Sequence, residues 1–342
     1  MATAQTNFKR IATEEAFVTQ EITDEWDKII ATGAPGDPGF RMMGQTILKP
    51  SPGTEIIHKR LTDLGAGRIK DMEADGIDMQ VISITSPGVQ VLEGSLAHEL
   101  AVHANDQLAA AVKKHPHRFS GLAAIAPQRA ELAAIELDRA VSTLGLKGAL
   151  INSHTNGKYL DDKRYWPILD AANALKVPIY LHPRTPSPSM VKPYLDYGLY
   201  FAGWGFAAET SLHALRLIMS GVFDQFPNLI IILGHMGEGI PFYLQRIDNR
   251  YLLQVKIGAV KKMQKLPSEY FKDNFVITTS GVVQQSSLQL SLEELGADRI
   301  LYAADYPYES VTESVHFIDE AKISDNDKHK VYHGNAERLF SL

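Results

Sequence analysis

Short apolar segments alternate with helical patterns along almost the whole chain, and this alternation limits the folds that the chain can adopt. One such segment, residues 229–233, is five consecutive aliphatic residues. It is too short for a free-standing helix, and it is apolar on both faces, as a parallel strand covered on both sides must be. Counting this one, eight such segments lie near residues 11, 80, 121, 148, 178, 230, 275 and 300.

Eight strands separated by helices predict an α/β protein with the (β/α)8, or TIM barrel, fold, formed by a single domain over residues 1–342. A doubly wound open sheet is the alternative. That fold normally has a glycine-rich phosphate loop after its first strand, and no G-x-G-x-x-G motif occurs there.

Three segments fall outside the alternating pattern. Residues 1–9 are predicted to be a short polar tail, residues 32–53 a loop rich in glycine and proline, and residues 183–208 an inserted loop at the carboxyl rim of the barrel. Long loops of this kind are often functional, so 32–53 is a candidate lid. A variable surface loop is the other interpretation.

The composition excludes several kinds of function. The net charge of −6 gives no basic surface for nucleic acid, and the absence of cysteine excludes disulfides, thiolate nucleophiles and zinc–thiolate sites. The first ten residues lack the apolar core of a signal peptide, and no run approaches the roughly 18 apolar residues of a membrane span. We therefore expect a soluble, cytoplasmic protein that binds neither nucleic acid nor membranes.

Polar residues stand at the carboxyl ends of most predicted strands, which is where parallel α/β folds place their chemistry. They are Glu14, Thr85, Asn152, His182, His235, Thr279, Ser280 and Asp305. Taken singly, each has an ordinary explanation, such as a packed histidine or an aspartate that forms a turn. Two carboxylates and two imidazoles at the ends of strands 1, 5, 6 and 8 together favour a site for a divalent metal ion.

Several motifs carry a resemblance to a known family: ATEEAF (12–17), TSPGVQ (85–90), GALIN (148–152), YLHP (180–183), ETSLHALR (209–216), LGHMGEG (233–239), ITTSG (277–281) and DYPY (305–308). Because these motifs occur together and in this order, the chain resembles the amidohydrolase superfamily over about residues 10–342. In particular it resembles the branch of non-oxidative ortho-hydroxybenzoate decarboxylases, which are carboxy-lyases acting on 2,3-dihydroxybenzoate, γ-resorcylate (2,6-dihydroxybenzoate) and 5-carboxyvanillate.

Two departures from the superfamily pattern limit the number of metal ions and the ligands that the resemblance implies. Superfamily hydrolases usually carry His-x-His on strand 1 and often a metal-bridging lysine at the end of strand 4. Here strand 1 has Glu14-Glu15-Ala16 and strand 4 ends in Asn152. The implied site holds one Mn²⁺, Zn²⁺ or Mg²⁺ ion, with open positions for substrate oxygens and no organic cofactor. Its implied ligands are Glu14, His182 and Asp305.

The resemblance also implies how the reaction proceeds. The carboxylate and the neighbouring phenolic oxygen of an ortho-hydroxybenzoate chelate a metal, and CO2 leaves after the carboxyl-bearing ring carbon is protonated. By resemblance Asp305 is the general acid for that protonation. His235, oriented by Glu238, would transfer the phenolic proton or fix the substrate.

The resemblance implies a small aromatic carboxylic acid as the substrate and leaves more than one such acid possible. Candidates for its pocket are Phe206, Thr85, Arg246, Tyr308, Asn152 and Trp204, with Arg184 as a second candidate for an anionic substituent. Relatives that act on 5-carboxyvanillate need an arginine for the second carboxylate, and the matching segment 51–57 has none. We therefore predict a monocarboxylate such as 2,3-dihydroxybenzoate. 5-Carboxyvanillate is the alternative, because Arg41 or Arg60 could replace the missing arginine.

Two other classes of function remain open at this point. One is a metal-dependent hydrolase of a lactone or amide, with Asp305 as the base for a metal-bound water. The other is a binding or scaffold barrel, which would have little reason to hold all four rim groups. Relatives form dimers or tetramers, so we expect a homodimer or homotetramer, with residues 183–208 and 240–268 as candidate contacts.

Overall fold

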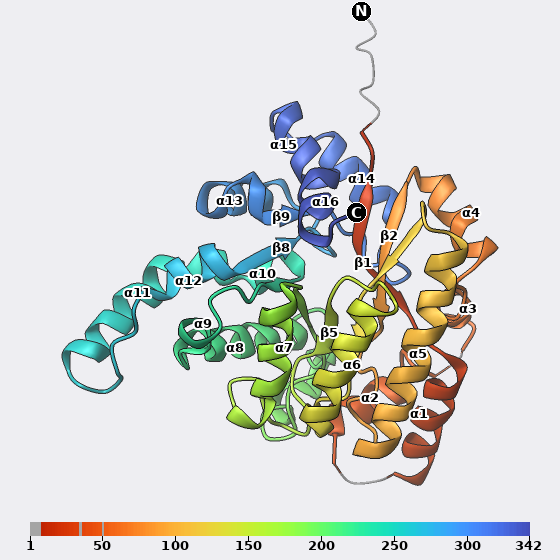
Figure 1. Cartoon of the computed structure of the whole chain (residues 1–342), viewed down its shortest axis with the longest axis horizontal. Helices are drawn as coiled ribbons and strands as arrows, with labels where there is room; N and C mark the ends of the chain where they lie inside the picture. The colour runs from red at the N-terminus through yellow and green to blue at the C-terminus, as the bar shows by residue number, and fades with distance from the viewer. Residues whose placement is uncertain (1–7, 34–35, 50) are drawn as a thin grey trace, which may run out of the picture.

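The computed structural model describes residues 8–33, 36–49 and 51–342, and its strands form a parallel barrel surrounded by helices (Figure 1). Most of the predicted tail, and residues 34, 35 and 50 of the predicted lid, lie outside the described residues. The strands are β1 (Ile11–Phe17), β2 (Met79–Ile84), β3 (Phe119–Gly121), β4 (Ala123–Ala124), β5 (Ala149–Asn152), β6 (Ile179–His182), β7 (Ile231–Leu233), β8 (Phe275–Thr278) and β9 (Ile300–Leu301).

The nine labelled strands make eight barrel strands, as the sequence predicts. β3 and β4 are two pieces of the third barrel strand. Between them, the backbone N–H of Leu122 continues the ladder to β2 by donating to Ile82 O (2.9 Å). The N–H of Ala123 starts the pairing with β5 by donating to Gly148 O (2.8 Å). One strand therefore joins the β1-β2-β3 sheet to the β4-to-β9 sheet.

Hydrogen bonds between β1 and the residues that follow β9 close the barrel. The backbone N–H of Thr13 donates to Tyr302 O (3.1 Å), and the N–H of Ala16 donates to Tyr306 O (2.7 Å). All residues of β1 and β2 are buried, as expected for strands covered on both faces. The carboxyl ends of all the strands consequently meet at one rim.

Helices cover the outside of this barrel and form the connections between its strands (Figure 1). They are α1 (Gln20–Thr32), α2 (Pro38–Gln45), α3 (Glu55–Leu61), α4 (Ala66–Asp75), α5 (Gly94–Lys114), α6 (Ala130–Ser142), α7 (Trp166–Leu175), α8 (Gly205–Met219), α9 (Val222–Gln225), α10 (His235–Glu238), α11 (Ile240–Lys256), α12 (Pro267–Asn274), α13 (Gln285–Leu295), α14 (Val311–Asp319), α15 (Asp325–His329) and α16 (Asn335–Phe340). None of the described helices has the length and apolar character needed to cross a bilayer.

The segment 32–53 differs from the predicted loop, because α2 occupies its centre. The Asp37 side chain accepts a hydrogen bond from the N–H of Phe40 (2.8 Å), and Pro38 takes the first helical position. A capping aspartate followed by proline is a helix start. Gly39 and Gly44 permit close packing: a Cβ on Gly44 would lie 2.4 Å from Ile30, and one on Gly39 would lie 2.5 Å from Thr185. The glycines that suggested a loop therefore allow the helix to lie against its neighbours.

The inserted segment 183–208 contains two short 3-10 turns, at Lys192–Tyr194 and Asp196–Gly198. Helix α8 begins at Gly205, so the last four residues of the predicted loop are helical. Phe206 is consequently on the first turn of α8, and Trp204 is its N-cap residue.

Candidate active site and metal centre

Strand β1 places Glu14 at the centre of the carboxyl rim. The register of β1 against β2 shifts between Ala12 and Glu15, and such bulges redirect side chains next to functional sites. Oε2 of Glu14 accepts hydrogen bonds from the hydroxyls of Tyr180, Thr278 (2.9 Å) and Ser280. These three donors fix the carboxylate in one orientation.

The other oxygen, Oε1, is buried and has no hydrogen-bond partner among the described residues. It faces Nε2 of His182 at 3.4 Å and Nε2 of His235 at 3.6 Å. A buried, unsatisfied carboxylate oxygen requires an explanation, and a bound cation is a good one. The residues present therefore fit a divalent metal ion.

His182 is the last residue of β6, and its ring is held by two acceptors. Nδ1 lies 2.9 Å from Oδ1 of Asn152 and 2.8 Å from the carbonyl oxygen of Pro183. Because both partners are acceptors, Nδ1 carries the hydrogen and Nε2 keeps its lone pair. Asn152 is itself fixed by Gln90, whose Oε1 accepts from the N–H of Asn152 (2.6 Å). Asn152, predicted as a substrate contact, thus orients His182.

His235 follows β7 in a strained turn, with φ of 52° at His235 and 54° at Glu238. Non-glycine residues with such angles cluster at active sites. Nδ1 of His235 is 2.8 Å from Oε1 of Glu238, as the sequence predicts for this pair. Glycine at the preceding position leaves room for Glu14: a Cβ on Gly234 would lie 3.0 Å from Oε2 and 3.1 Å from Oε1 of Glu14, so a larger residue there would press on this carboxylate.

Asp305 completes the cluster from the segment after β9, also with a left-handed φ of 59°. Its Oδ2 is 3.9 Å from Nε2 of His235. Glu14, His235 and Asp305 each offer a ligand atom within 4.8 Å of the others, and His182 approaches this group through Glu14. The structure therefore brings together all four predicted rim residues.

Burial and mutual charge shift the pKa values of Glu14, His235 and Asp305. Burial acts to raise the pKa of Glu14, but the imidazoles of His235 and His182 and the Ser280 hydroxyl lower it to about 2. Burial acts to lower the pKa of His235, but the carboxylates of Glu238 and Glu14 raise it well above its usual value. Burial and the charge of Glu14 raise the pKa of Asp305, against the opposing effect of His235.

A cavity of about 160 Å³ opens over the cluster. It is smaller than the roughly 300–1,000 Å³ of pockets for drug-sized ligands, so it suits a small molecule. It is lined by Met43, Ile47, Ile57, Thr85, Ser86, His182, Phe201, Ala202, Phe206, His235, Asp305, Tyr308 and Glu309. The predicted substrate contacts Thr85, Phe206 and Tyr308 are thus at the wall, and the hydroxyls of Thr85 and Tyr308 are hydrogen-bonded (2.7 Å).

Other predicted contacts lie away from the cavity wall. Trp204 is 59 % exposed, and Arg246 is exposed on α11. Arg184 is buried but is already paired with Asp37 and donates to the carbonyl oxygen of His154 (3.0 Å). These side chains do not meet the candidate substrate site in this structure.

Several wall residues were not predicted from the sequence. Met43 and Ile47 come from α2 and the residues after it, so recognising the Asp37-Pro38 helix start would have suggested an apolar face there. Glu309 lies one turn beyond Asp305, and its N–H donates to Asp305 O (3.1 Å). No sequence signal separates Glu309 from an ordinary surface glutamate.

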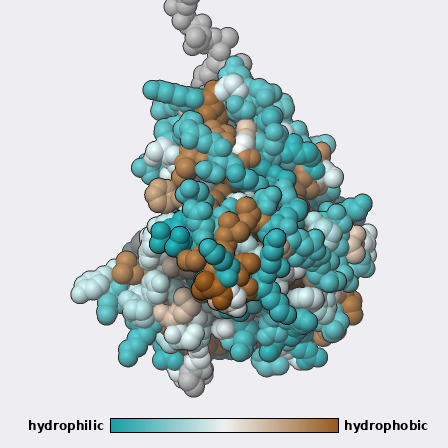
Figure 2. Space-filling view, turned by 90° about the vertical axis from the view of Figure 1, so that its left-hand side faces the viewer, coloured by the Kyte–Doolittle hydropathy of each residue, from teal (hydrophilic) through white to brown (hydrophobic). Residues whose placement is uncertain are grey.

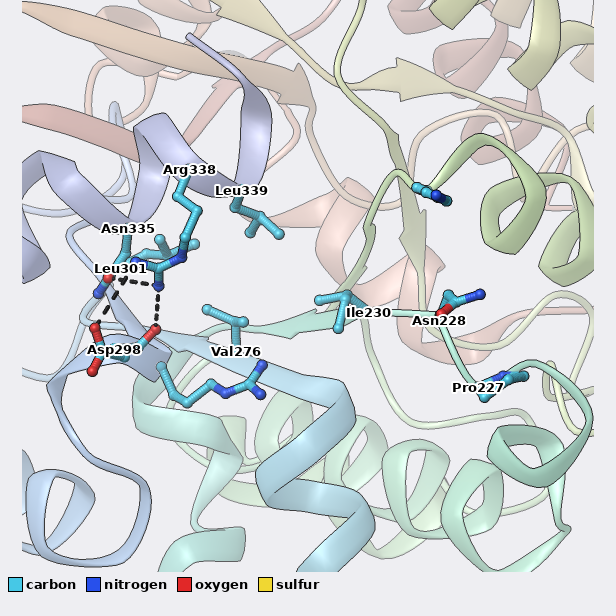
Figure 3. A pocket seen from close by; sticks show the side chains of 11 residues that line it. Pro227, Asn228, Ile230, Val276, Asp298, Leu301, Asn335, Arg338 and Leu339 are labelled. Carbon is cyan, nitrogen blue, oxygen red and sulfur yellow. Dashed lines mark hydrogen bonds and ion pairs between the residues drawn. The ribbon is translucent and has the colours of Figure 1, made fainter.

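A larger cavity of about 680 Å³ lies near the amino ends of β7, β8 and β9, where Ile230, Val276 and Leu301 contribute to its lining (Figure 3). Arg338 donates there to Asn335 Oδ1 and to Asp298 O, both at 2.9 Å. The described residues that line it include no histidine and a single carboxylate, that of Asp298. TIM barrels perform their chemistry at the carboxyl ends of the strands, so the smaller cavity is the candidate active site.

Comparison with known proteins identifies the family of the chain. The amidohydrolase family model matches residues 54–342. The γ-resorcylate decarboxylase of Polaromonas sp. is 38% identical over 347 residues, covering 97% of this chain and 98% of the relative.

Two solved structures are similar over nearly their whole length. One is the 5-carboxyvanillate decarboxylase of Novosphingobium aromaticivorans, complexed with manganese and 4-hydroxy-3-methoxy-5-nitrobenzoic acid. It is 41% identical, with a TM-score of 0.96 over 99% of this chain and 98% of that one. The other is a dihydroxybenzoic acid decarboxylase of Polaromonas sp. with manganese and the inhibitor 2-nitroresorcinol. It is 38% identical, with a TM-score of 0.87 over 98% of this chain and 97% of that one. The chain therefore belongs to the amidohydrolase family and is, like these relatives, a decarboxylase of the carboxy-lyase class.

Proposed function

We propose that this protein is a metal-dependent, non-oxidative decarboxylase of an ortho-hydroxybenzoate. The observation that carries the proposal is the cluster of Glu14, His182, His235 and Asp305, whose last three members line a small cavity with an aromatic wall. Phe206 and Phe201 form part of that wall, with ring centroids 4.9 Å apart. A flat aromatic acid would place its ring against these side chains and its oxygens over the cluster.

The metal ligands in this proposal are Glu14, His182 and Asp305. Bound there, a divalent ion would orient the substrate oxygens and stabilise their negative charge. His182 suits this role because its Nδ1 faces only carbonyl oxygens, which leaves Nε2 free to bind a metal. Manganese is bound in the two similar structures, and zinc and magnesium fit the same mixed oxygen and nitrogen donors.

Asp305 and His235 divide the proton transfers in this proposal. Asp305 delivers a proton to the ring carbon that carries the carboxylate, after which the carbon–carbon bond breaks and CO2 leaves. His235 receives or returns the phenolic proton. Its Nδ1 partner is the carboxylate of Glu238, which stabilises a protonated ring, whereas the partners of His182 are neutral oxygens.

The cavity wall supports a substrate with one carboxylate, such as 2,3-dihydroxybenzoate or a related dihydroxybenzoate. Among the described residues that line it, none is an arginine or lysine, and Glu309 adds a carboxylate. A second substrate carboxylate, as in 5-carboxyvanillate, would face this acid without a cation. Arg60 is instead paired with Asp71 (2.9 Å), and Arg41 donates to Gly33 O (3.0 Å).

A panel of substrates tests this assignment. We expect 2,3- and 2,6-dihydroxybenzoate to be consumed with Mn²⁺ present, and 5-carboxyvanillate to give a kcat/KM at least about 10-fold lower, because rejecting a poorly paired charge costs more than about 1.4 kcal/mol. Loss of substrate absorbance with Mn²⁺, Zn²⁺ or Mg²⁺ is the measurement. Preference for 5-carboxyvanillate would contradict the monocarboxylate assignment and leave the decarboxylase assignment intact.

We also propose that α11 contacts a second copy of the chain. Helix α11 extends away from the barrel (Figure 1), and Figure 2, which views the molecule from that side, shows apolar residues gathered on this face. Exposed residues of this region include Phe242, Tyr243, Leu252, Leu253, Ile257 and Val260. Exposed apolar patches of this kind mark interaction sites. A purely monomeric species in sedimentation velocity would contradict a homodimer or homotetramer.

A further inference from the structure

Glu15 is a fully buried carboxylate that the proposed reaction does not use. It follows Glu14 in β1, and the two side chains have different hydrogen-bond partners. Glu14 contacts the metal centre, whereas Glu15 contacts the segment after β9 that carries Asp305.

The two oxygens of Glu15 accept hydrogen bonds from the backbone of the residues on either side of Asp305. Oε1 accepts a hydrogen bond from the N–H of Ala304 (3.0 Å), and Oε2 accepts one from the N–H of Tyr306 (3.3 Å). The backbone N–H of Ala16 donates to the carbonyl oxygen of Tyr306 (2.7 Å), so β1 secures this segment at a third point.

Asp305 needs such support because its φ of 59° is in the left-handed region, which is unfavourable for residues other than glycine. Strained residues persist only where the surrounding structure holds them. Regular pairing of β8 with β9 ends at Leu301, before this segment begins. Beyond the end of this strand pairing, the hydrogen bonds to Glu15 therefore hold the backbone of residues 304 and 306.

A buried arginine and glutamine keep Glu15 in place. Nε2 of Gln80 donates to Oε2 of Glu15 (3.3 Å), and Oε1 of Gln80 accepts from Nη1 of Arg68 (3.1 Å). Arg68 is fully buried, and its guanidinium lies 4.8 Å from the ring centroid of Tyr306. The chain of contacts thus runs from Arg68 to Glu15 and returns to the residue after Asp305.

We propose that Glu15 is a positioning residue that holds the Asp305 carboxylate in its place at the metal centre. This inference rests on the proposed function, in which Asp305 binds the metal and donates the proton. Hydrogen bonds behind a metal ligand fix its direction, and removing them typically costs about 10–100-fold in metal affinity or activity.

The Glu15→Gln variant tests this role through Mn²⁺ affinity measured by isothermal titration calorimetry. Glutamine has the same shape, but its amide nitrogen cannot accept a hydrogen bond, so one of the two peptide N–H groups loses its partner. We expect Mn²⁺ binding to weaken about 10–100-fold and kcat to fall by a similar factor, with KM much less affected.

Glu136→Gln is the matched control. Glu136 is also buried and accepts hydrogen bonds from Asn105 (2.7 Å) and Arg139, but it lies on α6. This variant should bind Mn²⁺ as the wild type does. If Glu15→Gln does not fold, as judged by thermal melting, Glu15→Asp replaces it. That side chain is one methylene shorter and cannot reach both peptides, so the same loss is expected.

The Asp305→Ala background separates the positioning role from a general structural role. If Glu15 acts through Asp305, adding Glu15→Gln to Asp305→Ala should change Mn²⁺ affinity by less than about 2-fold, since nothing remains to be positioned. Equal losses in both backgrounds, or wild-type affinity in Glu15→Gln, would overturn the inference. Wild-type Mn²⁺ affinity in Asp305→Ala alone would instead show that Asp305 is not a ligand, which is a failure of the proposed function.

Discussion

Replacing Asp305 with asparagine is expected to abolish measurable turnover of the hydroxybenzoate substrate. A positioned general acid contributes roughly 10²–10⁴-fold to rate, and asparagine has no proton of comparable acidity to give to the ring carbon. The fold should survive, because asparagine tolerates the left-handed backbone at this position and has nearly the same shape. Initial rates at saturating substrate, with a separate measurement of substrate binding, test this prediction.

Asp248→Asn is the control for that substitution. Asp248 lies on α11 and accepts hydrogen bonds from the backbone N–H of Ser268 (2.9 Å) and its hydroxyl (2.6 Å), without a contact to the cavity. Its loss should leave kcat unchanged. Near-wild-type activity in Asp305→Asn would remove Asp305 from the role of proton donor.

The second large effect is expected for His235→Asn, which should lower kcat by roughly 10²–10⁴-fold. In the proposed division of roles this variant keeps its Mn²⁺ affinity within a few-fold of wild type. His182→Asn, by contrast, should lose Mn²⁺ binding, because His182 supplies a ligand. Parallel calorimetric titrations and rate measurements on the two variants distinguish the roles.

Either of two outcomes for His235→Asn would revise this assignment. A mild effect on kcat would make His235 a packing residue. A loss of Mn²⁺ affinity equal to that of His182→Asn would make it a metal ligand. The second outcome has a geometric basis, since Glu14, His235 and Asp305 have ligand atoms within 4.8 Å of one another.

The barrel could be predicted because each of its strands leaves a recognisable pattern of apolar residues in the local sequence. Strands buried on both faces are short, continuous apolar runs, and in a parallel barrel their carboxyl ends share one rim. The topology of eight parallel strands is sufficient to bring Glu14, His182, His235 and Asp305 together. This convergence does not depend on the side-chain rotamers of the four residues.

Details that depend on register and on tertiary contacts could not be predicted in this way. The function of Glu15 depends on a bulge in β1 and on the path of residues 304–306, neither of which leaves a pattern in the sequence. Trp204 and Phe206 are two residues apart, and only the start of α8 at Gly205 decides that Phe206 reaches the cavity. Helix α2 was missed because the glycines that pack it tightly also resemble those of a loop.

The most direct test of the central claim is the amount of CO2 released per molecule of aromatic acid consumed. With the Mn²⁺-loaded enzyme and 2,3-dihydroxybenzoate, we predict one CO2 and one catechol per substrate. The activity should be lost after treatment with a chelator and restored by Mn²⁺. Consumption of a lactone or amide without CO2, or decarboxylation that is unaffected by complete removal of metal, would contradict it.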